Sequence, residues 1–352
     1  MSKDKKLLNI MKNGGLFLIV VVITLWIILS KANLKEIVKA LLQVNIAYVA
    51  IAIVFMFFMV LCESVNIRNS LRVFKEKTTS LQCIQYSLVG IFFSSVTPAA
   101  TGGQPMQVYY MHKKKINISN AMLALLVCLA SYQFVAVGMA IMSLVVKFDV
   151  FKDTLGKFIF LLYIGIGLNI AFLLIILVSI FSKRFIFGIV NLTVKIINVF
   201  SKKKSLNFRK KALIEIDKYK KGATYLKNNK TFIMKTIFIA TLQISALHSI
   251  PFWVYKAFGM PGGNIIEFIT IQSALYITGA ALPLPGAVGI GEGGFLIFFK
   301  VIFPSQLLSS AMLISRGISF YAMVIISGIA VLMLQLSLNR AKNIKRAKLY
   351  EK

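Results

Sequence analysis

Three charged side chains lie within otherwise apolar stretches of the sequence, where a charge is costly and usually serves a function. Glu292 lies in a glycine-rich run, Arg316 lies in the last apolar stretch, and Glu63 lies near the end of an early one. A guanidinium can hold a phosphodiester through two parallel hydrogen bonds, so Arg316 is a candidate anion-binding residue. The alternative is an ion pair between Arg316 and Glu292 that holds the fold together. The place of Glu63 favours a residue at the membrane interface.

Two proline- and glycine-rich strings interrupt apolar stretches: SSVTPAATGGQPMQVYYM at 94–111 and LPLPGAVGIGEGGF at 282–295. A helix that breaks at membrane depth exposes backbone N–H groups and the positive end of its dipole, which together can hold an anion. Glycine also lets the backbone approach a ligand closely, although small residues serve helix packing as well. The prolines beside the glycines favour the broken helix. The candidate substrate-binding residues are Thr97, Thr101, Gly102, Gly103, Gln104, Gly289, Gly291, Glu292 and Arg316.

The sequence indicates no catalytic, cofactor or metal site. It contains no Walker, HExxH or GxSxG motif, and its 11 Asp and Glu residues leave little for an acid-rich metal site. Cys62, Cys83 and Cys128 lack the CxxC or Cys/His spacing of metal ligands. His248 is interpreted as a hydrogen-bonded structural residue rather than a proton relay.

The composition indicates that these residues belong to a helical membrane protein. Of the 352 residues, 58% are hydrophobic and 15% are charged, and the mean hydropathy is +0.81. Soluble domains are nearer to about 45–50% apolar and about 25% charged. The formal net charge of +30 comes from Lys and Arg in loops between apolar blocks. That pattern is typical of cytoplasmic loops and of attraction to anionic lipid, and it argues against a specific nucleic-acid binder.

These features predict an all-α polytopic membrane protein with about six full transmembrane helices and two re-entrant hairpins of broken helices. The arm after Pro105 is too short to cross a bilayer at 1.5 Å per residue, so the first string turns back within the membrane. The alternative is eight or nine spans, if either hairpin crosses. The full spans are expected at about 15–30, 46–63, 121–146, 158–181, 231–255 and 310–335, and the hairpins at 82–112 and 268–303.

The two hairpins are expected to form an inverted-topology repeat within a single membrane domain of residues 1–352. Each glycine-rich string is followed by a span that opens with Ala-Met-Leu, and in this alignment Gln104 takes the place of Glu292. Loop charge makes the first hairpin enter from inside and the second from outside, which is typical of transporters. The parts are a first repeat at about 47–181, a basic loop at 182–231, a second repeat at about 232–337 and a basic tail at 338–352, with both termini cytoplasmic.

The two strings, at this separation, resemble the transmembrane region of lysylphosphatidylglycerol synthases, the flippase-like domain of the multiple peptide resistance factor family. The resemblance covers roughly residues 10–340. It implies translocation of phospholipid such as (lysyl-)phosphatidylglycerol across the bacterial inner membrane, linked to resistance against cationic antimicrobial peptides. It assigns this activity to Thr97–Pro105 and Pro283–Gly294. In the family, lysyl transfer belongs to a C-terminal domain, which is not expected here because little sequence follows the last expected span.

Three functions therefore stay open. The first is a phospholipid translocase, and the second is a phosphatidylglycerol lysyltransferase that uses lysyl-tRNA. The third is a non-catalytic membrane partner of such an enzyme. The expected partners are anionic phospholipid and, for the third function, a separate lipid-modifying enzyme; an oligomer is compatible with all three.

Overall fold

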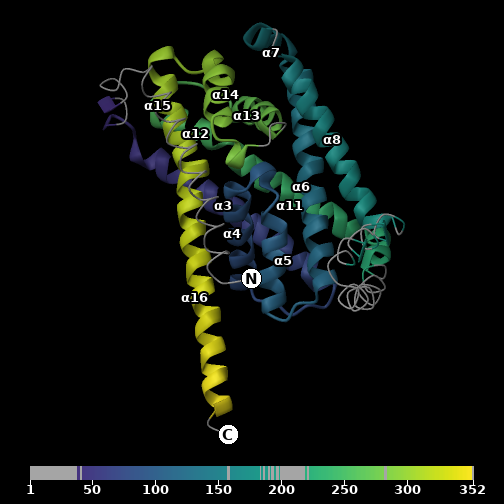
Figure 1. Cartoon of the computed structure of the whole chain (residues 1–352). Helices are drawn as coiled ribbons and strands as arrows, with labels where there is room; N and C mark the ends of the chain where they lie inside the picture. Colours follow the sequence, from purple (N-terminus) through teal and green to yellow (C-terminus); the bar gives the residue numbers. More distant parts are fainter. Residues whose placement is uncertain are drawn as a thin grey trace.

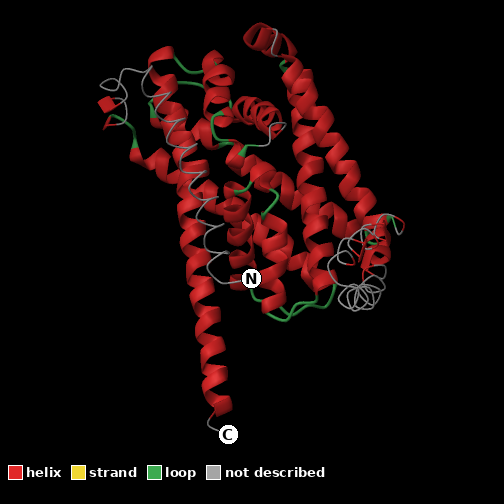
Figure 2. Ribbon diagram, in the orientation of Figure 1, coloured by secondary structure: helices red, strands yellow, loops and turns green. Residues whose placement is uncertain are grey.

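The computed structural model describes residues 42–156, 159–182, 222–280 and 284–350, together with 38–39 and single positions or pairs between 184 and 219. Over these ranges every regular element is a helix (Figure 2). The expected first span at about 15–30, most of the basic loop 182–231 and Pro283 lie outside the described residues.

Five helices in the described part of the chain are long and apolar enough to cross a membrane. They correspond to five of the six expected spans and confirm an all-helical, polytopic membrane protein. The last of them joins α15 (Ser305–Arg316), a π-helical turn (Gly317–Ala322) and α16 (Met323–Tyr350) into one long rod (Figure 1). The others are α3 (Ile46–Val73), α6 (Ile118–Val146), α8 (Ile159–Phe181), and α11 (Lys230–His248) with α12 (Ile250–Ala257).

The two glycine-rich strings form hairpins of broken helices. In the first, α4 (Ser80–Val96) is joined to α5 (Gly103–Lys113), and in the second, α13 (Ile265–Ala280) leads to α14 (Ile290–Phe298). The return arms have 11 and 9 residues, which gives lengths of about 16 and 14 Å against a hydrocarbon core of about 30 Å. Neither return arm is long enough to cross a bilayer, so the helix lengths do not support the alternative of eight or nine spans.

Both hairpins turn through the same backbone motif. A proline is followed by two residues in the left-handed region, with φ values of 50° and 54° at Ala99 and Ala100 and of 59° and 50° at Gly286 and Ala287. Each turn is closed by two hydrogen bonds of 3.2 Å in the same register. Alanine enters this region at a cost of about 1–2 kcal/mol, so the packing around the two turns imposes the conformation.

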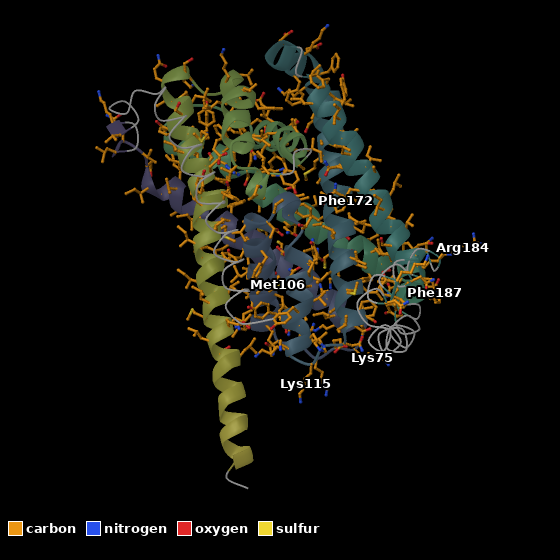
Figure 3. The ribbon with its side chains drawn as sticks, viewed as in Figure 1. Lys75, Met106, Lys115, Phe172, Arg184 and Phe187 are labelled. Carbon is orange, nitrogen blue, oxygen red and sulfur yellow. The ribbon has the colours of Figure 1, made fainter. Side chains whose placement is uncertain are left out.

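The two turns meet inside the bundle. The turn at Pro98–Ala100 contacts the turn at Pro285–Ala287, and α4 contacts the second turn as well. In Figure 1, α4 and α5 lie in the lower half of the molecule and α13 and α14 in the upper half, so the hairpins approach each other from opposite ends. Lys75 and Lys115 lie at the lower end (Figure 3). The short helix α7 (Phe148–Leu155) lies at the upper end, where Lys147 pairs with Glu267 at 2.6 Å.

Helix α3 has two different faces. Val54, Phe58 and Leu61 leave 63%, 41% and 47% of their surface exposed on the outside, as expected for side chains that contact lipid. Asn66 and Ser70 are buried on the inside, against the rest of the bundle. The helix therefore continues ten residues beyond the predicted end at residue 63, because its polar residues face protein rather than the membrane boundary.

Candidate functional site

Arg316 and Glu292 form an ion pair inside the second half of the bundle. The Nε atom of Arg316 donates to Oε1 of Glu292 at 2.9 Å, and the hydroxyl of Tyr321 donates to the same oxygen at 2.9 Å. The backbone amide of Gly289 donates to Oε2 at 2.7 Å. Glu292 is fully buried, and its carboxylate is compensated by one positive charge and three hydrogen bonds. The ion pair that the sequence left as an alternative is therefore present.

Local backbone geometry brings the members of this pair together. Glu292 lies in the first turn of α14, and its bond to Gly289 caps the helix; the φ value of 88° at Gly289 favours glycine. A Cβ atom at Gly291 would lie 2.8 Å from Cζ of Arg316, so only glycine leaves room for the guanidinium. Arg316 ends α15 just before the π-helical turn, an irregularity that often marks functional sites.

A cavity of about 360 Å³, here called the arginine cavity, opens beside the pair. Ala99 and Ala100 of the first turn, and Gly286 and Ala287 of the second, line it together with Arg316. Because both turns contribute to the wall, this cavity lies where the two hairpins meet.

Arg316 keeps donors available toward the cavity. A guanidinium has five N–H groups. Arg316 uses one on Glu292 and one on the carbonyl of Gly286, where Nη2 lies 3.3 Å from the oxygen. The remaining three have no acceptor among the described residues. The guanidinium also lies over the ring of Phe320, with Cζ 4.4 Å from the centroid, which fixes its plane.

Three further residues that line the cavity each carry a buried side-chain atom without a hydrogen-bond partner in the described part of the chain: Nε2 of His248, Oε1 of Gln272 and Oγ of Ser315. Nδ1 of His248 lies 2.8 Å from Oγ of Ser273, which itself donates to the carbonyl of Ile269. The serine hydroxyl is then the acceptor for Nδ1–H, which assigns Nε2 as an acceptor in a neutral ring. Buried polar atoms are nearly always paired, so these three are candidate contacts for a water molecule or a polar ligand.

A second cavity of about 790 Å³, here called the glutamate cavity, adjoins the first. The two share nine wall residues: Ser94, Ser95, Ala99, Ala100, Leu247, Tyr276, Ala280, Ser319 and Phe320. Glu63, Thr101 and Gln104 line the glutamate cavity alone. Glu63 lies ten residues before the end of α3, about 15 Å along the helix. The expected place of Glu63 at the membrane interface stays a prediction, because α3, at 28 residues or about 42 Å, is longer than a hydrocarbon core of about 30 Å.

Residues 15–327 match the family described as the lysylphosphatidylglycerol synthase transmembrane region. The chain belongs to that family. It is also 23% identical over 333 residues to a UPF0104 membrane protein from Pyrococcus horikoshii, a match that covers 90% of this chain and 96% of that protein. As the resemblance implied, this membrane protein is a flippase-like domain.

The candidate residues of the first string mainly build its turn. Oγ1 of Thr97 accepts from the amide of Gly102 at 2.9 Å and donates to the carbonyl of Phe93 at 2.6 Å. A Cβ atom at Gly103 would lie 2.2 Å from Oγ of Ser94, so this glycine allows α4 and α5 to pack closely. Of the five candidate residues in the first string, only Thr101 and Gln104 line a cavity.

The expected equivalence of Gln104 and Glu292 is displaced by one residue. The shared turn motif aligns Gly102 with Gly289, the residues that precede α5 and α14. Gln104 then corresponds to Gly291, and Glu292 corresponds to Pro105. The first hairpin thus carries no carboxylate at this position, and the charged side chain in the wall of the glutamate cavity is Glu63 of α3.

Several residues of the candidate site were not predicted from the sequence. Tyr321 follows Arg316 by five positions, which an α-helix places on a different face; the π-helical turn brings both to Glu292. Gln272 and Ser315 are ordinary polar residues of apolar helices in the sequence. Only the packed structure reveals that their side-chain oxygens are buried without partners.

Proposed function

We propose that this flippase-like membrane protein translocates an anionic phospholipid, such as phosphatidylglycerol or its lysyl derivative, between the leaflets of the bacterial inner membrane. The observation that carries the proposal is Arg316: three of its N–H donors find no acceptor among the described residues, and it lines a cavity where two broken hairpins meet. A phosphodiester offers the acceptors that such a guanidinium lacks.

The helix ends support the same ligand. α5 and α14 both begin at the meeting point of the hairpins, so the positive ends of two helix dipoles face that region. Paired broken helices with N-termini near the membrane centre are the usual anion sites of transporters. Glu292 neutralises the charge of Arg316 while the site is empty, which lowers the cost of a buried guanidinium.

The remaining polar atoms of the cavity match a glycerol headgroup. Nε2 of His248 and Oε1 of Gln272 are acceptors, and the free hydroxyls of phosphatidylglycerol are donors. A volume of about 360 Å³ falls within the range of small-ligand sites, about 300–1,000 Å³, and suits a headgroup rather than acyl chains. The chains would stay in the lipid beside the bundle.

The orientation forms part of the proposal. Lys75 and Lys115 lie at the end of the bundle from which the first hairpin enters (Figure 3). We propose that this end and both termini face the cytoplasm, because Lys and Arg are in excess in cytoplasmic loops. Delivery of a lysyl lipid to the outer leaflet would lower the negative surface charge that attracts cationic antimicrobial peptides.

The proposal is tested with purified protein in liposomes that carry fluorescent phosphatidylglycerol or its lysyl derivative. A membrane-impermeant quencher reports exposure in the outer leaflet, and protein-free liposomes give the background. We expect protein-dependent exchange that Arg316→Lys reduces and that Arg72→Ala, at the exposed end of α3, leaves unchanged. Exchange of neither lipid by the native protein would contradict the proposal and favour the lysyltransferase or partner alternatives.

A further inference from the structure

Glu63 is a carboxylate in the wall of the glutamate cavity with no positive partner among the described residues. Its hydrogen-bond partner there is Nε2 of Gln107, at the long distance of 3.4 Å from Oε1. Glu292, by contrast, has Arg316, Tyr321 and a backbone amide. A carboxylate in a cavity wall away from bulk water is costly unless a positive charge compensates it, and no ion pair supplies that charge to Glu63 within the described part of the chain.

Asn66 supplies a second acceptor one helical turn further along α3. Its side chain is 2% exposed, and Nδ2 donates to the carbonyl of Thr236 at 3.1 Å. This bond fixes the orientation of the amide, and Oδ1 is left buried with no donor in the described structure. Residues i and i+3 share a helix face, and both Glu63 and Asn66 line the same cavity.

The surrounding residues hold Glu63 in place. Nε2 of Gln107 also donates to the carbonyl of Tyr86 at 3.0 Å, which anchors this amide on α4. A Cβ atom at Gly90 would lie 2.4 Å from Nε2 of Gln107, so the glycine makes room for the amide. The amide of Gln107 reaches Oε1 of Glu63. Oε2 of Glu63 has no donor among the described residues.

We infer that the glutamate cavity binds a monovalent cationic group between the Glu63 carboxylate and Oδ1 of Asn66. One unpaired carboxylate balances one positive charge, and carboxylate and amide oxygens are the ligands that hard cations prefer. The charge could be a free alkali cation or a primary ammonium group of a lipid. Because the two cavities share part of their walls, this cation would lie near an anion bound at Arg316, and each would favour the other.

The inference goes beyond the proposed function and is tested without any transport assay. Full-length protein in a neutral maltoside detergent is titrated with radioactive sodium ion and with radiolabelled methylammonium, at constant ionic strength with N-methylglucamine. We expect saturable binding that Glu63→Gln abolishes and Asn66→Leu weakens about tenfold, the effect of losing about 1.4 kcal/mol. The matched control Glu267→Gln changes a carboxylate that pairs with Lys147 at the other end of the bundle, and it should bind normally.

The two probes distinguish the sources of the charge. Preferential binding of sodium ion identifies a free alkali cation, and preferential binding of methylammonium identifies a lipid ammonium group. Absence of saturable binding of both probes to the native protein overturns the inference, as does binding that Glu63→Gln leaves unchanged. If Glu63→Gln does not fold, unchanged affinity in Asn66→Leu overturns it in the same way.

Discussion

The guanidinium of Arg316 donates through Nε to the fully buried carboxylate of Glu292 at 2.9 Å, and the same side chain lines the arginine cavity. Glu292 is held in turn by Tyr321 and by the amide of Gly289. We therefore propose that the carboxylate is a positioning group and that the guanidinium is the group that contacts ligand.

Removal of one charge of the Arg316–Glu292 ion pair should lower the free energy of unfolding more than removal of both charges. Arg316→Ala leaves Glu292 buried and uncompensated, which should lower the free energy of unfolding by about 3–5 kcal/mol. The double variant Arg316→Gln/Glu292→Gln replaces both charges with amides and should recover most of that loss. Thermal unfolding in detergent measures both values. Equal destabilisation of the single and double variants would show that the ion pair does not hold the two helices.

Two neighbouring glycines of α14 provide a matched pair of variants. Gly291→Ala puts a Cβ atom 2.8 Å from Cζ of Arg316 and must displace the guanidinium, whereas Gly293→Ala meets nothing within 4 Å. We expect lipid exchange to fall at least about tenfold in Gly291→Ala, since about 1.4 kcal/mol of lost binding suffices. Gly293→Ala should exchange lipid at the native rate. Equal rates in the two variants would exclude a role for the position of Arg316.

The headgroup preference should depend on Gln272. Phosphatidylethanol is an anionic phosphodiester without headgroup hydroxyls, so it cannot donate to Oε1 of Gln272 or to Nε2 of His248. We expect native protein to exchange phosphatidylglycerol several-fold faster than phosphatidylethanol, because about 1 kcal/mol is gained per hydrogen bond. Gln272→Met should reduce this preference by slowing phosphatidylglycerol alone. A preference that the variant leaves intact would mean that the hydroxyls bind elsewhere.

We propose that the two hairpins enter the membrane from opposite sides. The residues that directly follow each hairpin should then be accessible from opposite sides of the membrane. Single cysteines at Lys114 and Gln306 are introduced after Cys62, Cys83 and Cys128 are replaced by serine. An impermeant thiol reagent applied to intact cells should label Gln306→Cys only, and Lys114→Cys should react only after the membrane is opened. Labelling of both from the same side would contradict the inverted arrangement.

Span positions were predictable because they depend on the length of apolar runs. Five expected spans are present, and the hairpins follow from the prolines and glycines at Pro98–Gly103 and Pro285–Gly291. The end of α3 was not predictable from hydropathy. Asn66 and Ser70 lower the apolar content of its last turns, but they are buried against protein and the helix continues.

The candidate site was predictable only in part, because its remaining geometry depends on tertiary contacts. Glu292 and Arg316 stand out in the sequence as charges in apolar stretches. Tyr321 joins them only through a π-helical turn, which an α-helical register does not predict. The buried, unpaired oxygens of Gln272 and Asn66 arise from packing between helices far apart in the sequence.

The most direct test of the central claim is lipid exchange by the double variant Arg316→Gln/Glu292→Gln in liposomes. In this variant two neutral amides replace the buried ion pair. A loss of exchange therefore cannot be attributed to an uncompensated buried charge. If the Arg316 guanidinium binds the phosphate, quencher-accessible phosphatidylglycerol should accumulate no faster than in protein-free liposomes, while Arg72→Ala retains the native rate. Exchange at the native rate in the double variant would contradict the role of the arginine cavity in lipid translocation.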